Sequence, residues 1–414
     1  MPPYTELQEI RRGGSEIDLL VLHEMDNWSI ISAESVEEFK PIRPLGHGDM
    51  GIVFLAMHIH SGKPVAMKVI DKETVKKKRS YKRAWMEREI LSRLDHPFLP
   101  KLFAKFESKN HSYLLMSYCS GGDLNVLRQR QDNNRFSESA ARFYAAEVIL
   151  ALEYLHQHGI LYRDLKPENI LVQANGHIML TDFDLSLINS NFQKPKSRSF
   201  REDQKTTKTS SSWPLLAKLK PIGTTTCMDS IPSTPKREEH GRTMSRSSSL
   251  RENNKNTWLD DIKKRSFYEQ SHSFVGTEEY VAPEVLWGTG HGFAVDWWAF
   301  GILLYEMVYG KTPFKGSTRK DTFYNVLCKE PGLSGPWSPL KDLLQHLLVK
   351  EPSCRLGSKN GAQEIKNHEF FDGVKWDELE FVSRPPFVPP PFGFDNSQGV
   401  LDDNQEMKGK IETF

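Results

Sequence analysis

One short polar segment carries the residues whose types and spacing are best suited to chemistry. It reads Tyr-Arg-Asp-Leu-Lys-Pro-Glu-Asn over residues 162–169. Asp164 can accept the proton of an attacking hydroxyl, Lys166 can neutralise a transferred phosphate, and Asn169 can bind a metal ion. Thirteen residues after Asn169 stands Asp182, whose carboxylate can hold Mg²⁺ against phosphates. This spacing predicts phosphoryl transfer to a hydroxyl group.

A glycine-rich segment upstream is the second candidate for phosphate contacts. Gly46, Gly48 and Gly51 follow the pattern G-x-G-x-x-G-x-V, which ends at Val53. Glycine lets a backbone approach phosphates closely and adopt positive φ. A flexible hairpin is the alternative interpretation. No helix is predicted directly after the pattern, which disfavours its dinucleotide-binding form.

Lys68 stands in the apolar run Val-Ala-Met-Lys-Val, where a charge is costly unless it is paired. Glu87 lies on a helix predicted over residues 80–94 and is the expected partner, with Glu89 as a neighbouring candidate. Lys68 would then hold the α- and β-phosphates while the carboxylate orients it. The alternative is a lysine on an edge strand whose ammonium group reaches solvent. Four phosphate-handling motifs in the required order are more specific than any one of them alone.

Apolar patterning indicates the elements that must position these side chains. Residues 39–116 alternate short apolar runs with turns, which predicts antiparallel strands with one helix among them. Residues 137–159 predict a long amphipathic helix that begins after a serine N-cap and stops at a glycine. Residues 295–310 predict a core helix, and residues 339–352 another that ends at a proline. The expected class is α+β, with a small β-rich lobe before a larger helical lobe.

Charge is spread unevenly along the 414 residues. The chain has 55 basic and 54 acidic side chains, a net charge of +1. Residues 191–266 hold 17 of the basic and 8 of the acidic ones, so this segment carries +9 and the remainder −8. Its low apolar content and its serine and threonine runs predict a largely disordered insert.

Cysteine spacing and hydropathy favour an intracellular protein. The four cysteines lie far apart without CxxC spacing, which argues against a zinc cage or a disulfide scaffold. No apolar run is long enough for a membrane helix, and the N-terminus lacks the apolar core of a secretion signal. We therefore expect a reduced, cytoplasmic protein.

Taken together, the motifs over residues 39–371 resemble the eukaryotic protein kinase family. Residues 276–284 read Gly-Thr-Glu-Glu-Tyr-Val-Ala-Pro-Glu and residues 296–301 read Asp-Trp-Trp-Ala-Phe-Gly. The resemblance implies that Glu284 pairs with Arg355 to brace the larger lobe. It also implies a bilobal protein-kinase-like fold, with a small antiparallel β-sheet lobe that holds one key helix and a larger, mainly helical lobe. ATP and Mg²⁺ are the implied cofactors, with Mn²⁺ as an alternative metal.

Within that family the chain is similar to the AGC group. Residues 350–357 resemble its K-D-P-x-x-R-L-G pattern, and residues 387–391 resemble the tail that wraps back onto the small lobe. Two departures, Asp184 in place of the usual glycine after Asp-Phe and the insert before Ser273, resemble plant AGC kinases. That branch includes phototropins and the oxidative-signal-inducible kinases, and the lack of a flavin domain favours the latter type.

The resemblance divides the chain into three parts. Residues 1–38 form an extension without an interpretable motif, residues 39–371 the kinase domain interrupted by the insert at 191–266, and residues 372–414 the C-terminal tail.

The change at position 184 has its own interpretation. Aspartate tolerates left-handed backbone better than most residues, but it restricts a loop more than glycine does. We therefore predict an active enzyme in which the loop at Asp184 has fewer conformers.

The resemblance also assigns roles at the nucleotide site. Met116 would guard the pocket behind adenine, and the backbones of Tyr118 and Cys119 would bond to adenine. The full set of implied ATP-binding residues is Leu45, Gly46, His47, Gly48, Asp49, Met50, Gly51, Ile52, Val53, Lys68, Glu87, Met116, Tyr118 and Cys119.

Carboxylates are expected to read the peptide substrate. The resemblance matches Asp123, Glu168 and Glu306 with positions that bind arginines ahead of the target hydroxyl, and charge-assisted pairing explains why acids are needed there. A solvated helix residue is the alternative for Glu306. Thr277 stands where serine/threonine kinases keep a threonine bonded to the catalytic Asp and Lys. The charge of −8 outside the insert agrees with a basic substrate.

Regulation is expected to act through Ser273. A phosphate there would order the loop by pairing with Arg163, and an ordinary loop serine is the alternative. The family's phosphoinositide-dependent kinase, or autophosphorylation, would supply the phosphate. That upstream kinase docks on a C-terminal F-x-x-F, for which this chain has Ile411 and Phe414. Isoleucine keeps the apolar bulk but lacks the ring, so weaker docking is expected.

The insert suggests a further role in localisation. Its positive charge, switched by phosphorylation at its R-x-x-S motifs, would contact anionic lipid or direct nuclear import. The inner face of the plasma membrane and the nucleus are therefore alternatives to the cytoplasm, and a solvated spacer is the alternative for the insert. We expect a monomer with no specific nucleic-acid partner.

The sequence predicts a serine/threonine kinase that acts in intracellular signalling on proteins with arginine-containing motifs. A pseudokinase scaffold that binds partners without turnover is the alternative from another class. A phosphopeptide-binding adaptor would need an arginine cluster, for which the sequence offers no support.

Overall fold

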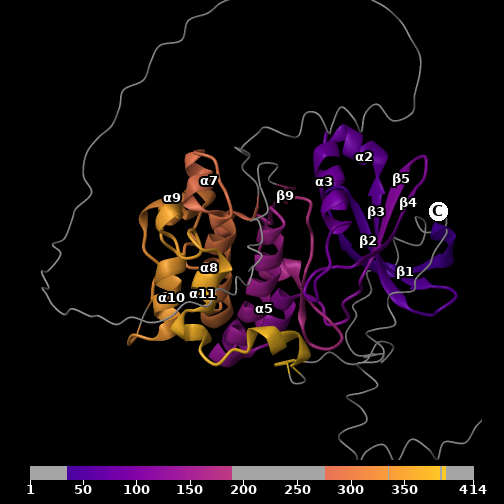
Figure 1. Cartoon of the computed structure of the whole chain (residues 1–414). Coiled ribbons are helices and arrows are strands. Elements are labelled where there is room, and N and C mark those ends of the chain that lie inside the picture. Colours follow the sequence, from indigo (N-terminus) through magenta and orange to yellow (C-terminus); the bar gives the residue numbers. More distant parts are fainter. Residues whose placement is uncertain (1–34, 189–275, 334, 383–384, 388–414) are drawn as a thin grey trace, which may run out of the picture. The chain divides into compact units, whose positions relative to one another are not determined.

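The computed structural model describes residues 35–188, 276–333, 335–382 and 385–387. The N-terminal extension up to residue 34, the insert at 191–266, Ser273, and the docking pair Ile411 and Phe414 lie outside these residues. The interpretations that concern them, and the domain boundaries, stay predictions. Figure 1 labels most of the helices and strands that the structure describes.

Five antiparallel strands form the sheet of the small lobe, in the order β1-β2-β3-β5-β4 (Figure 1). They are β1 (Phe39–His47), β2 (Gly51–His58), β3 (Pro64–Asp71), β4 (Leu102–Glu107) and β5 (His111–Met116). Lys68 on the central strand β3 pairs in register with Val53 of β2 and Leu114 of β5. The alternative that placed Lys68 on an edge strand is therefore wrong.

Two helices follow β3 and belong to the small lobe. The aspartate that ends β3 caps α2 (Lys72–Lys77), because the Asp71 carboxylate accepts the N–H groups of Glu73 and Thr74. The helix predicted over residues 80–94 is α3 (Tyr81–Leu91), which is slightly shorter at both ends. Its buried face carries Met86, Glu87, Ile90 and Leu91 at the spacing of an amphipathic helix.

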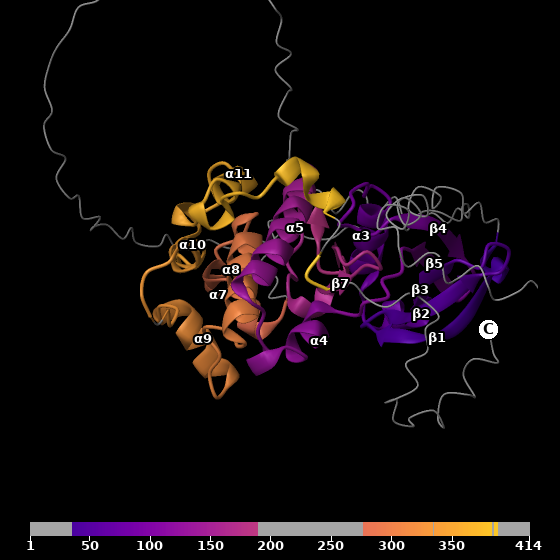
Figure 2. The same ribbon diagram turned by 90° about the horizontal axis from the view of Figure 1, so that it is seen from below.

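Two long helices form the centre of the larger lobe and run side by side (Figure 2). In α5 (Glu138–Gln157), the Ser137 hydroxyl accepts the N–H of Ala140, and Gly159 just beyond the helix has φ of 71°. Both predicted ends are thus confirmed. α8 (Ala294–Tyr309) is buried along most of its length and ends at Gly310, whose φ is 74°.

Shorter helices surround this pair. They are α4 (Leu124–Gln129), α7 (Pro283–Trp287), α9 (Arg319–Cys328), α10 (Pro339–Leu347) and α11 (Ala362–Lys366). α10 ends five residues before the predicted stop at Pro352, because Leu348 already leaves helical geometry and Pro352 instead begins a separate 3-10 turn. None of the helices in the described residues is both long and apolar enough to cross a membrane.

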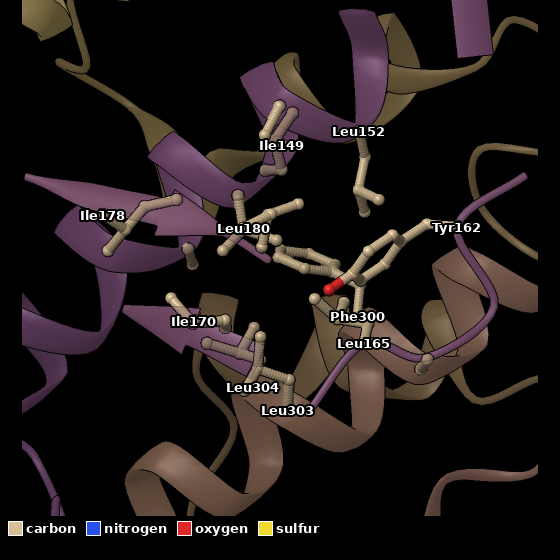
Figure 3. Packing of buried hydrophobic residues seen from close by; sticks show 14 of the residues in the cluster. Ile149, Leu152, Tyr162, Leu165, Ile170, Ile178, Leu180, Phe300, Leu303 and Leu304 are labelled. Atoms are coloured by element: carbon tan, nitrogen blue, oxygen red, sulfur yellow. The ribbon is translucent and has the colours of Figure 1, made fainter. Parts of the chain in front are cut away.

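Two small two-stranded sheets lie next to the polar segment that carries the candidate catalytic residues. β6 (Ile160–Leu161) pairs with β9 (Leu187–Ile188), and β7 (Ile170–Val172) pairs with β8 (Ile178–Leu180). Figure 3 shows Leu165 of that segment packed with Tyr162 and Phe300 in the core between α5 and α8. Burying a leucine side chain contributes about 1.5–3 kcal/mol. The apolar residues of the segment therefore fix the polar ones in place.

The expected brace between Glu284 and Arg355 is present and buried. The two guanidinium nitrogens of Arg355 lie 2.7 and 2.9 Å from the two carboxylate oxygens. Its remaining N–H groups donate to the carbonyls of Ala294, Val349 and Lys350. All five donors of the guanidinium group are thus used. The predicted α+β, bilobal kinase-like fold is confirmed.

Candidate active site

The glycine-rich turn between β1 and β2 offers open space at two of its three glycines. A β-carbon at Gly46 would meet no atom within 4 Å, and one at Gly48 only a backbone oxygen at 3.8 Å. Gly51 differs, since a β-carbon there would lie 1.9 Å from the Val69 carbonyl oxygen of β3. Gly51 is therefore required by strand packing, whereas Gly46 and Gly48 leave room for a ligand.

The turn itself is anchored through its tip. The side chain of Met50 is buried in the hydrophobic core, so it serves packing and only its backbone remains for the predicted nucleotide contact. The carbonyl of Asp49 accepts a hydrogen bond of 2.7 Å from Lys78. The other turn and strand residues of the predicted set, Leu45, His47, Ile52 and Val53, lie on β1 and β2 next to it.

Lys68 pairs with Glu87, as the sequence predicts. Its ammonium group bonds to the Glu87 carboxylate and lies 3.7 Å from that of Asp182. Glu89, the neighbouring candidate, instead pairs with Arg93 on the surface of α3. Burial opposes the charge on Lys68, but attraction to Glu87 and Asp182 outweighs it and raises the pKa of Lys68. Lys68 therefore carries a positive charge between two acids.

Asp164, Lys166 and Asn169 form one hydrogen-bonded cluster. The same Asp164 oxygen, Oδ2, accepts 2.9 Å from the Lys166 ammonium group and 2.8 Å from the Asn169 amide nitrogen. Asn169 also donates to the Asp164 backbone carbonyl at 2.8 Å. These bonds fix the carboxylate and leave its second oxygen, Oδ1, as the acceptor for another proton.

Asp296 supports this cluster from below, and sequence reasoning assigned it no role. Its fully buried carboxylate accepts the N–H of Tyr162 at 3.0 Å and the N–H of Arg163 at 2.7 Å, and lies 2.8 Å from a ring nitrogen of His156. The sequence did contain a signal for this role. Asp296 stands in the apolar run of α8, and a buried charge needs several partners.

Backbone strain flanks the candidate site on both sides. Arg163 and Asp182 have φ of 68° and 57°, a left-handed geometry that non-glycine residues rarely adopt. Such conformations persist where the surrounding structure holds them, and they concentrate at functional sites. Asp182 is thereby turned toward Lys68, and its carboxylate stays partly exposed.

The φ of Asp184 is not positive, so this aspartate does not use the left-handed region that it tolerates. The expectation of fewer loop conformers at Asp184 stays a prediction. The carboxylate of Asp184 instead pairs with the guanidinium group of Arg83 on α3, and it is buried. Arg83 was not among the predicted site residues, because no local pattern links residues 101 positions apart.

The three acids predicted to read the substrate differ in environment. Glu168 is exposed, whereas the Asp123 carboxylate caps α4 by accepting the N–H of Val126 at 2.8 Å. Both carboxylate oxygens of Glu306 are already bonded, one to Arg128 at 3.0 Å and the other to the Tyr280 hydroxyl.

The solvated alternative for Glu306 is wrong, since its side chain is only 14% exposed and both of its carboxylate oxygens are bonded. A substrate arginine would have to share its oxygens with Arg128. Thr277 lies beside Asp164 at a cavity of about 30 Å³. The hydrogen bond that the resemblance implies between these two side chains is not formed in this structure.

The residues expected beside adenine lie at the end of β5 and directly after it. Met116 ends that strand, between Ala66 of β3 and Leu102 of β4. Tyr118 is half-buried, and Cys119 is buried with its sulfur 3.6 Å from that of Met179. Burial raises the pKa of the Cys119 thiol to about 12, so this cysteine serves packing rather than reactivity.

Comparison with known sequences decides the family. A profile described as the protein kinase domain matches residues 39–209 and 260–371. The chain is a member of the protein kinase family. Members of this family generally use ATP and Mg²⁺ and act on protein substrates.

Named relatives place this kinase among plant serine/threonine kinases. It is 46% identical over 367 residues to "Serine/threonine-protein kinase KIPK1" of Arabidopsis thaliana, covering 86% of this chain and 39% of that protein. It is 46% identical over 370 residues to "Serine/threonine-protein kinase UCNL" of the same plant, covering 86% and 84%. "Serine/threonine-protein kinase OXI1", also from that plant, is 43% identical over 357 residues, covering 84% and 78%.

These relatives confirm the resemblance to plant AGC-type serine/threonine kinases, including the oxidative-signal-inducible type. The chain spans most of the length of UCNL and OXI1 but well under half that of KIPK1.

The residues of this kinase fit a nucleotide and a metal. Space is open beside Gly46 and Gly48, a charged lysine faces it from β3, and one Glu87 oxygen, Oε2, is buried without a hydrogen bond. Asp182 and the Asn169 amide oxygen supply the hard oxygen ligands that Mg²⁺ prefers. The site therefore suits Mg·ATP in its donor set and in its free space.

Proposed function

We propose that this kinase is active and transfers the γ-phosphate of Mg·ATP to serine and threonine hydroxyls that follow arginine residues. The observation that carries the proposal is the hydrogen-bonded cluster of Asp164, Lys166 and Asn169. Its geometry leaves one carboxylate oxygen for a substrate hydroxyl. Every phosphate- and metal-handling position of the family is retained, so nothing favours the pseudokinase alternative.

Asp164 acts as the base in this mechanism. It accepts the proton of the substrate hydroxyl on its second oxygen, Oδ1, because Lys166 and Asn169 already occupy the first, Oδ2. The Lys166 ammonium group, 2.9 Å from the Asp164 carboxylate, would offset negative charge on the group being transferred. The buried carboxylate of Asp296 keeps this backbone in place through Tyr162 and Arg163.

Lys68, Glu87 and Asp182 act on the nucleotide side. Bound Mg·ATP supplies the phosphoryl group and a metal ion that neutralises its charge. Asn169 and Asp182 would hold the metal, and Lys68 would hold the phosphates. The Glu87 carboxylate pairs with the Lys68 ammonium group and so holds it in position.

Arginine preference is supported by the charge around the peptide end of the site. Glu168 is exposed and lies near Glu306, where their like charges raise the pKa of the Glu306 carboxyl group beyond the effect of burial. A substrate guanidinium group would relieve this repulsion. Glu168 is the strongest candidate contact, because the carboxylates of Asp123 and Glu306 already have partners.

The test is a phosphotransfer assay of the purified full chain with Mg·ATP and an R-x-x-S peptide. We expect Asp164→Asn to lower kcat by about 10²–10⁴-fold, the usual contribution of a positioned base. We expect Glu168→Gln to reduce the preference for this peptide over its A-x-x-S counterpart. Activity that survives Asp164→Asn, or a wild-type chain that binds ATP without turnover, would contradict the proposal.

Regulation through Ser273 rests on the charge near Arg163. Burial lowers the pKa of Arg163 to about 10, so a nearby phosphate would stabilise its charged form. We expect Ser273→Ala to lower kcat, whereas a chain phosphorylated at Ser273 should be activated. Equal activity of the two forms, with phosphorylation verified by mass spectrometry, would exclude this regulation.

Docking and localisation are separate proposals. Deletion of residues 412–414 should lower Ser273 phosphorylation by a phosphoinositide-dependent kinase, if Ile411 and Phe414 form its docking site. Replacing Lys263, Lys264 and Arg265 with alanine should reduce binding to anionic vesicles and redistribute the protein in cells. Unchanged phosphorylation or unchanged distribution, respectively, would contradict each.

A further inference from the structure

Arg83 occupies a distinctive place on α3. It precedes Glu87 by four residues, so the two side chains project from the same face of the helix. Glu87 reaches Lys68 in the sheet, while Arg83 reaches the segment that carries Asp182 and Asp184. One helix face thus connects both halves of the phosphate site.

The contact between Arg83 and Asp184 is the stronger of the two that Arg83 makes. The Asp184 side chain is 10% exposed, and the Arg83 side chain 35%. Although burial opposes its charge, attraction to Asp184 and Asp49 raises the pKa of Arg83. Like-charge repulsion from Asp182 acts on Asp184, and the guanidinium group offsets it. A glycine at position 184, the usual residue in the family, could not make this contact.

The second contact reaches the glycine-rich turn. Another guanidinium nitrogen of Arg83 lies 3.3 Å from the Asp49 carboxylate. Asp49 is 63% exposed, so this arm is weakened by solvent. It nevertheless links the turn, α3 and the metal-binding segment through one side chain.

We propose that Arg83 and Asp184 form a positioning pair for phosphoryl transfer. The pair holds α3 against the segment that carries Asp182, so that Glu87 stays on Lys68 and Asp182 stays at the phosphate site. The proposal rests on the proposed kinase function for its catalytic consequence, but the coupling of α3 to the segment is a property of the protein alone.

The experiment uses the full chain and a double-mutant cycle. The variants are Arg83→Met, Asp184→Asn and both together, with Asp184→Glu as the conservative variant. Arg93→Met is the matched control, because Arg93, just beyond the end of α3, forms an exposed ion pair with Glu89 of that helix. Three quantities are measured: hydrogen exchange over α3 without ligand, affinity for a fluorescent ATP analogue, and kcat and KM for ATP.

We expect each single variant to lower kcat/KM by about tenfold through both a lower kcat and a higher KM for ATP. The double variant should be no worse than either single one, since both remove the same interaction. Hydrogen exchange over α3 should rise in Arg83→Met, in Asp184→Asn and in the double variant. Asp184→Glu should retain most of the activity, and Arg93→Met should behave like the wild type.

Hydrogen exchange over α3 that is the same in Arg83→Met, Asp184→Asn and Arg93→Met would overturn the proposal. Hydrogen exchange does not depend on turnover, so it tests whether Arg83 and Asp184 hold α3 in place even if the wild-type chain is inactive. Multiplicative losses of kcat/KM in the double variant would also overturn it. Absence of phosphotransfer by wild type, with raised exchange in the variants, would contradict the proposed function alone.

Discussion

Two buried ion pairs in the two lobes differ in how completely they are satisfied. Arg355 and Glu284 in the larger lobe use all five guanidinium donors and both carboxylate oxygens. Lys68 and Glu87 in the small lobe are also buried, yet one Glu87 oxygen has no hydrogen bond, and Asp182 beside them is 42% exposed. We call the first pair closed, because all of its donors and acceptors are bonded. We call the second pair open, because one of its oxygens is not.

The difference separates scaffolding from function. A closed pair has no bonding capacity left, so it can only stabilise the fold. An open pair retains charge and an unsatisfied atom toward free space, at an energetic cost that a ligand can relieve. Burial and charge alone would therefore have placed both pairs in one class, whereas the hydrogen-bond inventory distinguishes them.

The largest effect is expected at the closed pair. Arg355→Met should lower the free energy of unfolding by about 4 kcal/mol, because it leaves the Glu284 carboxylate buried and unpaired. Urea denaturation followed by circular dichroism measures this. The double variant Arg355→Met with Glu284→Gln should recover part of the loss. A loss below about 1 kcal/mol would break the distinction between the two pairs.

The open pair should respond in activity more than in stability. Lys68→Met should lower kcat/KM by about 100-fold or more, since it removes a charge aimed at the ligand. Its free energy of unfolding should fall by less than about 2 kcal/mol, because Lys68 has one hydrogen bond to lose where Arg355 has five, and one Glu87 oxygen is already unbonded. Lys105→Met, an exposed lysine on β4, is the matched control. A stability loss like that of Arg355→Met would show that this pair is structural too.

A smaller effect is expected at His96, which is partly buried and has no hydrogen-bonded acidic partner, so it provides a comparison for both ion pairs. Burial lowers its pKa to about 4, and its ring nitrogen accepts the N–H of Phe98 at 3.2 Å, so it is neutral when folded. The unfolded chain, with a pKa near 6.5, binds more protons between these values, so stability is lost as the pH falls. From pH 8 to pH 5 the loss should be about 2 kcal/mol.

His96→Asn supplies the control for that prediction. Asparagine keeps an acceptor for the Phe98 N–H but does not titrate. The wild type should therefore lose about 2 kcal/mol more than His96→Asn over the same pH range, as measured by urea denaturation. Parallel pH profiles of the two proteins would contradict a lowered pKa of His96 in the folded chain.

Most of the fold could be predicted because its signals are local. The serine cap before α5 and the glycine after it lie within the pattern of that helix. Alternating apolar residues indicate the strands. Asp164 and Asn169 stand just before the hairpin of β7 and β8, and Asp182 stands just after it. The pairing of Lys68 with Glu87 followed from a general rule, since a buried charge needs a partner.

What could not be predicted depends on contacts between distant parts of the chain. Arg83 and Asp184 lie 101 residues apart, and Arg128 and Glu306 lie 178 apart. In the sequence, an arginine on a helix gives no signal of a specific distant partner. Resemblance assigned Glu306 to the substrate, but only the folded chain brings Arg128 and Tyr280 to its carboxylate.

The left-handed backbone of Arg163 and Asp182 has a consequence for protein engineering. Each conformation costs about 1–3 kcal/mol, which glycine at the same position would relieve. Selection of variants for heat resistance alone should therefore favour glycine at these two positions. The enriched variants would survive heating better yet would lose the Asp182 carboxylate or the Arg163 guanidinium group. A library screened in this way would reveal which residues this kinase keeps for chemistry at the expense of stability.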